Sequence, residues 1–293
     1  MPDTDATPAI AGRTVLITGG SSGIGKATAL GLARMGASLA ITGRDRGRTE
    51  AAAHEIRAAG GGRVDVLIGD LSVQAEVRRV AEQALERLDR LDVLVNNVGG
   101  YWNTRHVTAD GLEHTFALNH LAPFLLTDLL LERLQAGGSA RVVTVSSGAH
   151  ALGKIDFDDL QGERSYSPFR AYAQSKLANV MFSHELARRL AGTGVTANAL
   201  HPGVVSTGFG VEDAGRVQRL LVPLGRPFMK SPTQGAATSI HLAAAPELQH
   251  VTGRYFADRK PKKSSKLSHD HQAAERLWQV SAELVGLEPD SRK

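Results

Sequence analysis

Cysteine is absent from this chain of 293 residues, so disulfides, thiol nucleophiles and cysteine-ligated zinc sites are all excluded. No apolar run approaches the roughly 18 residues that would indicate a membrane-spanning helix, so we expect no membrane span. Residues 1–12 are polar and lack the zones of a secretory signal. We therefore expect a disordered tail on a cytoplasmic protein.

The net charge is also small. The 34 basic and 30 acidic side chains leave a formal charge of only +4, so nucleic acid is not an expected partner. Basic residues do gather within 254–266, where a solvated loop is a simpler interpretation than a site for an anionic partner. His269 and His271 beside Asp270 supply too few donors for a closed zinc site, so no metal site is predicted.

A glycine-rich turn near the amino terminus is the first positive signal. Residues 13–18 are apolar and β-branched and predict a strand, glycines follow, and the apolar spacing after them predicts a helix. This order suits a dinucleotide, whose pyrophosphate binds backbone N–H groups at the helix amino terminus. Gly19 would form the tight turn, Gly23 would allow close approach, and Gly25 would let the helix pack against the sheet.

The second signal is Tyr172 and Lys176, four residues apart in a predicted helix. At this spacing both side chains lie on one face, so the ammonium group can approach the phenol. A neighbouring cation favours the phenolate and would lower the tyrosine pKa from about 10 towards neutral pH. Tyr172 would then be a usable proton donor, although a lone pair of this kind is more often an ordinary pair on a helix surface.

Several motifs accompany these two in a fixed order. They are Thr18-Gly-x-x-x-Gly-Ile-Gly25, Asn96-Asn-Val-Gly99, Asn119, Ser147, Tyr172-x-x-x-Lys176 and Pro202-Gly203. From about residue 13 to residue 256 the chain resembles the short-chain dehydrogenase/reductase superfamily. Further segments resemble its retinol dehydrogenase-like branch, among them Asn119-His-Leu, Ser175-Lys-Leu-Ala-Asn179 and His201-Pro-Gly203. The resemblance implies an enzyme that interconverts an aldehyde or ketone and the corresponding alcohol by direct hydride transfer with a nicotinamide cofactor.

The resemblance also implies a catalytic group, which consists of Asn119, Ser147, Tyr172 and Lys176. The serine would polarise the substrate carbonyl, and the tyrosine would give it a proton. The lysine would hold the nicotinamide ribose, and the asparagine would help to hold a water that links the lysine to solvent. Ser146 is the rival of Ser147 for the serine role.

Cofactor contacts are expected at Gly19, Ser21, Ser22, Gly23, Ile24, Gly25, Arg44, Asp70, Leu71, Asn97, Gly99, Tyr172, Lys176, Pro202, Gly203, Val205 and Thr207. At the end of the second strand, an acidic residue would bind the ribose hydroxyl of NAD, whereas a 2′-phosphate needs a cation. Gly43 occupies that position and Arg44 follows it, which favours NADP(H). NAD(H) is the alternative, since Asp45 lies two residues further on. Asp70 could equally be a helix cap.

Alternating strand and helix patterns predict a single Rossmann-type α/β domain over residues 13–293, with a doubly wound, mainly parallel sheet of seven strands. Strands are expected at 13–18, 37–42, 64–68, 91–95, 141–146, 195–200 and 253–257. Helices are expected at 46–59, 73–88, 111–134 and 169–190, the third with a kink at Pro123. In such sheets, ligands bind beyond the carboxyl ends of the strands.

The substrate side is less defined. Residues 203–233 are the expected substrate-loop region, and their apolar side chains, with Tyr101 and Trp102 opposite, favour a lipophilic substrate. The segment 153–167 resembles an insertion of the same branch and would form a pocket wall. A different class of function is a catalytically silent NADP(H) sensor or scaffold, which would not need the full catalytic group. A homo-oligomer is an open option.

Overall fold

The computed structural model describes residues 10–60, 62–206 and 229–288. Within them, one sheet of eight strands has the order β3-β2-β1-β4-β5-β6-β7-β8. The strands are β1 (Thr14–Ile17), β2 (Ser38–Gly43), β3 (Val64–Ile68), β4 (Val93–Asn96), β5 (Arg141–Val145), β6 (Thr196–His201), β7 (Arg254–Ala257) and β8 (Lys260–Lys262). Strands β1 to β7 run parallel and β8 is antiparallel to β7. The doubly wound fold is therefore confirmed, with one strand more than predicted.

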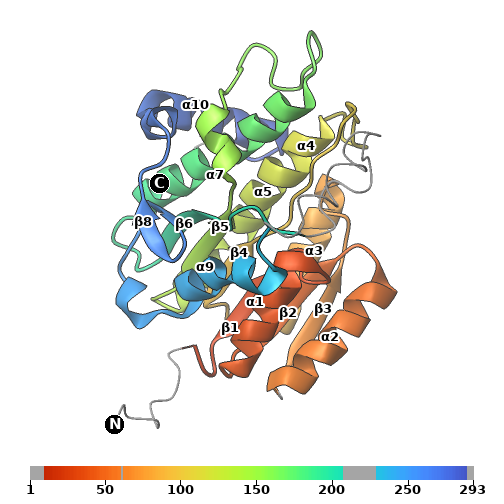
Figure 1. Cartoon of the computed structure of the whole chain (residues 1–293), viewed down its shortest axis with the longest axis vertical. Helices are drawn as coiled ribbons and strands as arrows, with labels where there is room; N and C mark the ends of the chain where they lie inside the picture. Colours follow the sequence, from red (N-terminus) through yellow and green to blue (C-terminus); the bar gives the residue numbers. More distant parts are fainter. Residues whose placement is uncertain (1–9, 61, 207–228, 289–293) are drawn as a thin grey trace.

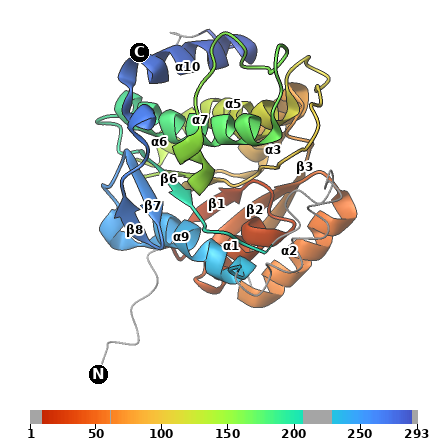
Figure 2. The same cartoon turned by 45° about the horizontal axis from the view of Figure 1, so that its top comes forward.

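Helices cover both faces of this sheet (Figures 1 and 2). One face carries α1 (Gly23–Arg34), α2 (Arg46–Gly60) and α9 (Pro232–Ala244). The other carries α3 (Gln74–Arg87), α5 (Ala122–Leu129), α6 (Leu131–Ala136) and α7 (Pro168–Arg189), with α10 (His271–Leu284) packed on the outer side of α7. Among the described residues, no helix combines the length and the apolarity needed to cross a bilayer.

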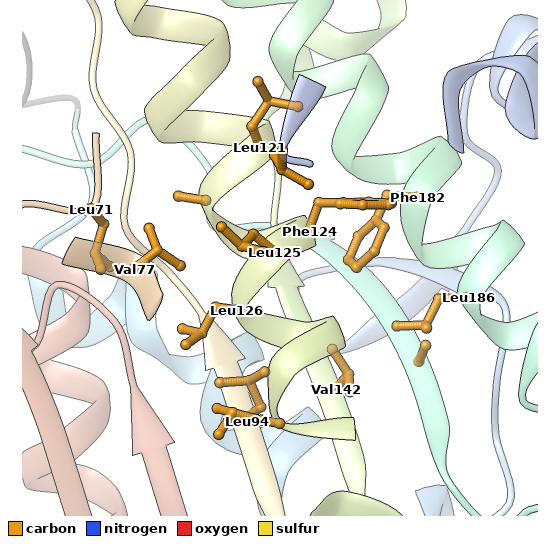
Figure 3. Close-up of a cluster of buried hydrophobic side chains, with 14 of the residues drawn as sticks. Leu71, Val77, Leu94, Leu121, Phe124, Leu125, Leu126, Val142, Phe182 and Leu186 are labelled. Atoms are coloured by element: carbon orange, nitrogen blue, oxygen red, sulfur yellow. The ribbon is translucent and has the colours of Figure 1, made fainter. Parts of the chain in front are cut away.

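The strands are apolar on both faces because helices cover both. In β1, Leu16 belongs to the core beneath α3, α5 and α7, whereas Val15 and Ile17 belong to the core beneath α1, α2 and α9. Figure 3 shows the first core, where Phe124 of α5 and Phe182 of α7 lie above the sheet. Their ring centroids are 5.8 Å apart. This packing fixes α7, and with it Tyr172 and Lys176, against the sheet.

The predicted helix over 111–134 is broken. A short α4 (His114–Phe116) is followed by a π-helical turn (Ala117–Leu121) and then by α5. The physical reason lies in Pro123, which has no N–H to donate to the carbonyl of Asn119. The Nδ2 of Asn179 on α7 donates to that carbonyl instead, at 2.8 Å. The proline was expected to kink the helix, and the break falls just before it.

The edge strand β3 has its outward carbonyl groups occupied. Three arginine side chains from α2 and α3 donate to alternate carbonyls, in the pairs Arg57 with Val64 (2.5 Å), Arg79 with Ile68 (2.9 Å) and Arg87 with Val66 (3.2 Å). An edge strand whose backbone groups are already bonded is a poor template for another strand. The groove beside these arginines is separate from the site described below.

Two expectations were wrong in part. The basic segment 254–266 is exposed at its lysines and irregular at residues 263–265, as expected, but Lys260–Lys262 forms β8, joined to β7 by a two-residue turn at Asp258 and Arg259. The tail expected to be disordered over residues 1–12 is ordered at residues 10–12. Ile10 is only 2% exposed and packs in the core beneath α1, and the backbone N–H of Gly12 donates to the carbonyl of Gly36. Residues 1–9 lie outside the described part.

Candidate active site

A cleft of about 530 Å³ lies beyond the carboxyl ends of the parallel strands. Its walls come from the segments that follow strands β1 to β6, which is where a doubly wound sheet binds its ligand. Every residue expected to contact the cofactor lines this cleft, except Thr207, which lies outside the described residues. Most of the expected substrate-loop region, 203–233, also lies outside them.

The glycine turn is shaped by close backbone contacts. Gly19 has a φ of +67°, in the region that favours glycine. A Cβ at Gly25 would lie 2.2 Å from the carbonyl oxygen of Gly19 and 2.5 Å from Nδ2 of Asn97. That Nδ2 donates to the carbonyl of Thr18 at 2.8 Å, which ties the turn to the end of β4. Gly25 therefore packs helix α1 against the turn and Asn97, and a side chain there would push them apart.

The amino terminus of α1 faces the same cleft. Ser22 is the residue before α1, and its side chain makes no capping bond to the helix. Ser21, Ser22 and the first residues of α1 line the cleft. Backbone N–H groups at a helix amino terminus bind phosphate oxygens, and a free hydroxyl beside them adds a donor. The residues present therefore fit the pyrophosphate of a dinucleotide.

The end of β2 leaves no room for an acidic residue at position 43. A Cβ at Gly43 would lie 2.2 Å from Oγ1 of Thr49 on α2. Asp45, the carboxylate that kept NAD(H) open as the alternative, lines the cleft, but its Oδ1 accepts from the backbone N–H of Arg48 at 2.7 Å and so caps α2. Arg44 and Arg48 also line this part of the cleft. Arg48, in the first turn of α2, was not predicted from the sequence as a cleft residue.

Asp70 shapes the turn that follows β3. Its Oδ1 accepts from the backbone N–H of Ser72 at 3.0 Å and from the Ser72 hydroxyl at 2.8 Å. Val73 precedes α3, so Asp70 forms the turn before that helix and is not its cap. It also lines the cleft, as expected for a cofactor contact.

Ser147 and Tyr172 form a hydrogen bond with each other at the inner end of the cleft. Ser147 follows β5 and Tyr172 lies in the first turns of α7. The hydroxyl of Ser146 points elsewhere, since it donates to the backbone carbonyl of Lys176 at 2.7 Å. The structure therefore places Ser147, and not its rival, beside the tyrosine.

Lys176 lies one helical turn below Tyr172. Its Nζ donates to the carbonyl of Val145 at 3.3 Å and lies 5.7 Å from the centroid of the Tyr172 ring. Lys176 is 3% exposed, and this burial lowers its pKa to about 8 because the ammonium form loses solvation. At neutral pH it is therefore still largely protonated.

The predicted lowering of the tyrosine pKa is wrong for the protein without ligands. Burial raises the pKa of Tyr172, because the phenolate loses more solvation than the neutral phenol, and the hydrogen bond with Ser147 offsets only part of this effect. The spacing of Tyr172 and Lys176 could be read from the sequence, but the depth of burial could not. At neutral pH the tyrosine is the neutral phenol, which is the form that donates a proton.

Asn119 lies behind the cleft and is fully buried. Its Nδ2 donates to the carbonyl of Gly100 and to the hydroxyl of Ser175, both at 3.0 Å, and its Oδ1 accepts from the Gly100 N–H at 2.7 Å. A Cβ at Gly99 would lie 3.1 Å from both this Oδ1 and Nζ of Lys176. The amide therefore braces the segment after β4 and stands beside the lysine.

His114 and Leu118 are among the other cleft residues that were not predicted from the sequence. Their spacing of four places them on one helical face, a signal that was available. The His114 ring lies 4.3 Å from the ring of Trp102, and burial lowers the pKa of His114. Tyr101, whose ring lies 5.6 Å from that of Tyr172, and Trp102 both line the cleft, as anticipated.

The segment 153–167 lies against the chain that follows β4. The side-chain Oε1 of Gln161 accepts from the backbone N–H of Glu113 at 2.6 Å, and its backbone carbonyl accepts from Nε of Arg105 at 2.9 Å. The hydroxyl of Tyr166 donates to the carbonyl of Trp102 at 3.4 Å. These bonds hold the insertion beside the aromatic side of the cleft.

Comparison with known proteins agrees with this geometry. Residues 13–215 match the family model described as short chain dehydrogenase. The chain is 48% identical to retinol dehydrogenase 12 of Mus musculus, covering 95% of this chain and 88% of that protein, and 43% identical to retinol dehydrogenase 14 of Homo sapiens, covering 94% and 87%.

Solved structures give the same result. An uncharacterized protein from Mycobacterium Paratuberculosis superposes with a TM-score of 0.77 at 36% identity, covering 96% of both chains. A blue fluorescent protein from a metagenomic library, in complex with NADPH, superposes with a TM-score of 0.68 at 30% identity, covering 85% of this chain and 97% of that one. These matches show that the protein is a nicotinamide-dependent oxidoreductase that acts on alcohol or carbonyl groups. The chain belongs to the short-chain dehydrogenase family and, within it, to the retinol dehydrogenase-like branch.

Proposed function

We propose that this protein reduces lipophilic aldehydes or ketones to alcohols with NADPH, with Tyr172 as the proton donor. The observation that carries the proposal is the hydrogen bond between Ser147 and Tyr172 at the inner end of a dinucleotide cleft, with Lys176 buried beneath them. A binding or scaffolding protein has no need for a buried cation at this place, because desolvating a charge costs stability.

The bound cofactor supplies the hydride, and the protein supplies position and protons. Ser147 donates a hydrogen bond to the substrate carbonyl oxygen and thereby polarises it. As the carbonyl carbon gains the hydride, its oxygen takes the proton of the Tyr172 hydroxyl. The tyrosine recovers its proton from solvent by way of Lys176, and Asn119, beside the lysine, helps to hold the water that completes this path.

NADP(H) is the proposed cofactor because of the charge at the end of β2. Arg44 and Arg48 both line the cleft there, and two guanidinium groups match the charge and geometry of a phosphate. Asp45 is committed to capping α2, and Gly43 cannot carry a carboxylate without displacing Thr49. The blue fluorescent protein that shares this fold was solved with NADPH, which supports the same choice.

A lipophilic substrate is proposed from the aromatic side of the cleft. Tyr101 and Trp102 line the cleft, with the Tyr101 ring centroid 5.6 Å from that of Tyr172, and ligand pockets of this kind take apolar groups. The names of the similar retinol dehydrogenases agree with an apolar substrate.

A panel of aldehydes and ketones tests the proposal. Purified protein is mixed with NADPH or NADH and each carbonyl compound, and the loss of absorbance by the reduced nicotinamide is followed. We expect turnover of apolar carbonyl compounds, faster with NADPH than with NADH. Tight NADPH binding without turnover of any compound would instead identify a cofactor sensor.

A further inference from the structure

Residues 202–206 follow β6 and form one wall of the cleft, which Pro202, Gly203 and Val205 line. Lys230 holds this wall in place. The carbonyl of Lys230 accepts from the N–H of Ser206 at 2.9 Å, and its N–H donates to the carbonyl of Val204 at 2.8 Å. Val205 and Lys230 thus form a parallel bridge, which joins the two described ends of the chain around the undescribed residues 207–228. The position of the wall is therefore coupled to the position of Lys230.

The side chain of Lys230 also lies on this wall. Gly203 has a φ of +91°, and a Cβ there would lie 2.9 Å from both Cδ and Nζ of Lys230, so the lysine side chain covers that face of the glycine. The Nζ lies 3.5 Å from the carbonyl oxygen of Pro202 and 2.5 Å from Oδ1 of Asp258. Asp258 belongs to the turn between β7 and β8, so Lys230 connects that turn to the cleft.

The turn itself is strained. Asp258 and Arg259 have φ angles of 51° and 61°, and they are the two non-glycine residues in the left-handed region among the described ones. A two-residue hairpin turn of this form normally uses glycine, because side chains raise its free energy. Strain of this kind persists where neighbouring contacts hold it. Here Lys230 holds the Asp258 carboxylate, and Oγ1 of Thr238 on α9 accepts from the Arg259 N–H at 3.2 Å.

We propose that the ion pair between Lys230 and Asp258 positions the cofactor-binding wall formed by residues 202–206. Both are positioning residues, since neither lines the cleft, and they act through the Pro202 carbonyl and the face of Gly203. The β7–β8 turn, within the basic segment, thereby contributes to cofactor affinity. The proposal rests on the proposed function only in taking the cleft as the NADP(H) site.

The turn offers a matched pair of substitutions. Asp258→Gly removes the carboxylate and relieves the strain, whereas Arg259→Gly relieves the strain next to it and leaves the ion pair intact. NADPH affinity is measured by the fluorescence of the bound reduced nicotinamide, and folding by thermal unfolding. We expect Asp258→Gly to raise the dissociation constant of NADPH roughly three- to fivefold, the range of an exposed ion pair. Its unfolding temperature should not fall, and Arg259→Gly should bind NADPH as the wild type does.

Two further measurements sharpen the test. Lys230→Met, which keeps the apolar stem, should weaken NADPH binding to a similar degree, and adding Asp258→Gly to it should have little further effect, because both remove one contact. In about 1 M salt the difference between wild type and Asp258→Gly should shrink, since an exposed pair is screened.

Equal NADPH affinity of wild type, Asp258→Gly and Arg259→Gly would overturn this inference alone. Equal weakening by both glycine variants, together with a lower unfolding temperature, would also overturn it, because the turn would then be merely structural. A wild type that binds no NADPH would overturn the proposed function and this inference with it.

Discussion

The two ends of the cleft are built in different ways. The cofactor end is defined by the backbone, at positions such as Gly25 and Gly43 where a Cβ would lie 2.2 Å from a neighbouring atom. The end proposed for catalysis is defined by buried side chains, and burial moves the pKa of Tyr172 upwards and that of Lys176 down to about 8. We therefore expect cofactor binding to depend on steric fit and the reaction to depend on desolvation. Substitutions at one end should then change either cofactor affinity or turnover, but not both.

The largest difference between the effect on turnover and the effect on NADPH binding is expected from Tyr172→Phe. The ring and its packing remain, but the proton donor is lost, so turnover should fall by roughly a thousandfold or more. The dissociation constant of NADPH should change by less than about threefold. Steady-state kinetics and fluorescence titration measure the two quantities. A variant with near-normal turnover would show that another group donates the proton.

Gly25→Ala is expected to act mainly on NADPH binding. The added methyl group would lie 2.2 Å from the carbonyl oxygen of Gly19, so the glycine turn has to shift. We expect NADPH binding to weaken roughly a hundredfold, in line with displaced phosphate contacts worth a few kcal/mol. Gly47→Ala is the control, because its new Cβ would meet only Oδ1 of Asp45, at 3.6 Å. Equal affinity of the two variants would contradict the steric account.

A smaller effect is expected from Arg44→Ala, which changes the choice of cofactor and leaves the catalytic residues intact. Loss of one charge-assisted contact should reduce the preference for NADPH over NADH roughly tenfold. Arg46→Ala is the matched control, since Arg46 lines the groove at the β3 edge and not the cleft. Comparing kcat/KM for both cofactors gives the preference, and an unchanged ratio in Arg44→Ala would remove this arginine from the phosphate site.

The smallest effect is expected from pH. Lys176 is protonated below a pKa of about 8, so carbonyl reduction should be constant from pH 6 to 7 and fall roughly fourfold between pH 7 and 8.5. The stability of the fold should instead rise with pH. The unfolded chain keeps the lysine proton up to about pH 10.4, so between the two pKa values the unfolded state binds more protons and the wild type gains stability as pH rises.

Lys176→Met tests this sign, because it has no proton to lose. Its advantage in unfolding temperature over the wild type should shrink between pH 7 and pH 9.5. An advantage that grows with pH would show that burial does not lower the pKa of this lysine.

The sequence predicted the parts of this molecule that repeat a local pattern. Strand β3 was placed at 64–68 as found, because the apolar run ends at clear turn signals. The described residues that were expected to contact the cofactor all line the cleft, because glycine spacing and strand ends fix where the backbone lies. Ser147 and Tyr172 were paired although 25 residues separate them in the chain, since the resemblance supplied what local pattern could not.

The remaining features depend on contacts between distant segments. Strand β8 forms only because β7 offers its edge, and the lysine-rich sequence by itself favours solvent. The upward shift of the Tyr172 pKa depends on how deeply α7 is packed. Asn119 accepts from the Gly100 N–H, a residue of the segment after β4, and its own carbonyl, left without the N–H of Pro123, accepts from Asn179 of another helix.

The π-helical turn at Ala117–Leu121 has a consequence for changes in chain length. Its wider loop holds one residue more than regular helix spacing requires. Deleting Leu118 would remove this extra residue and leave the flanking turns in phase. A deletion within α5 would instead turn the preceding chain by about 100°, so His114 would rotate away from Trp102 and the Glu113 N–H from Gln161. Rotational phase, more than length, is what this helix must preserve.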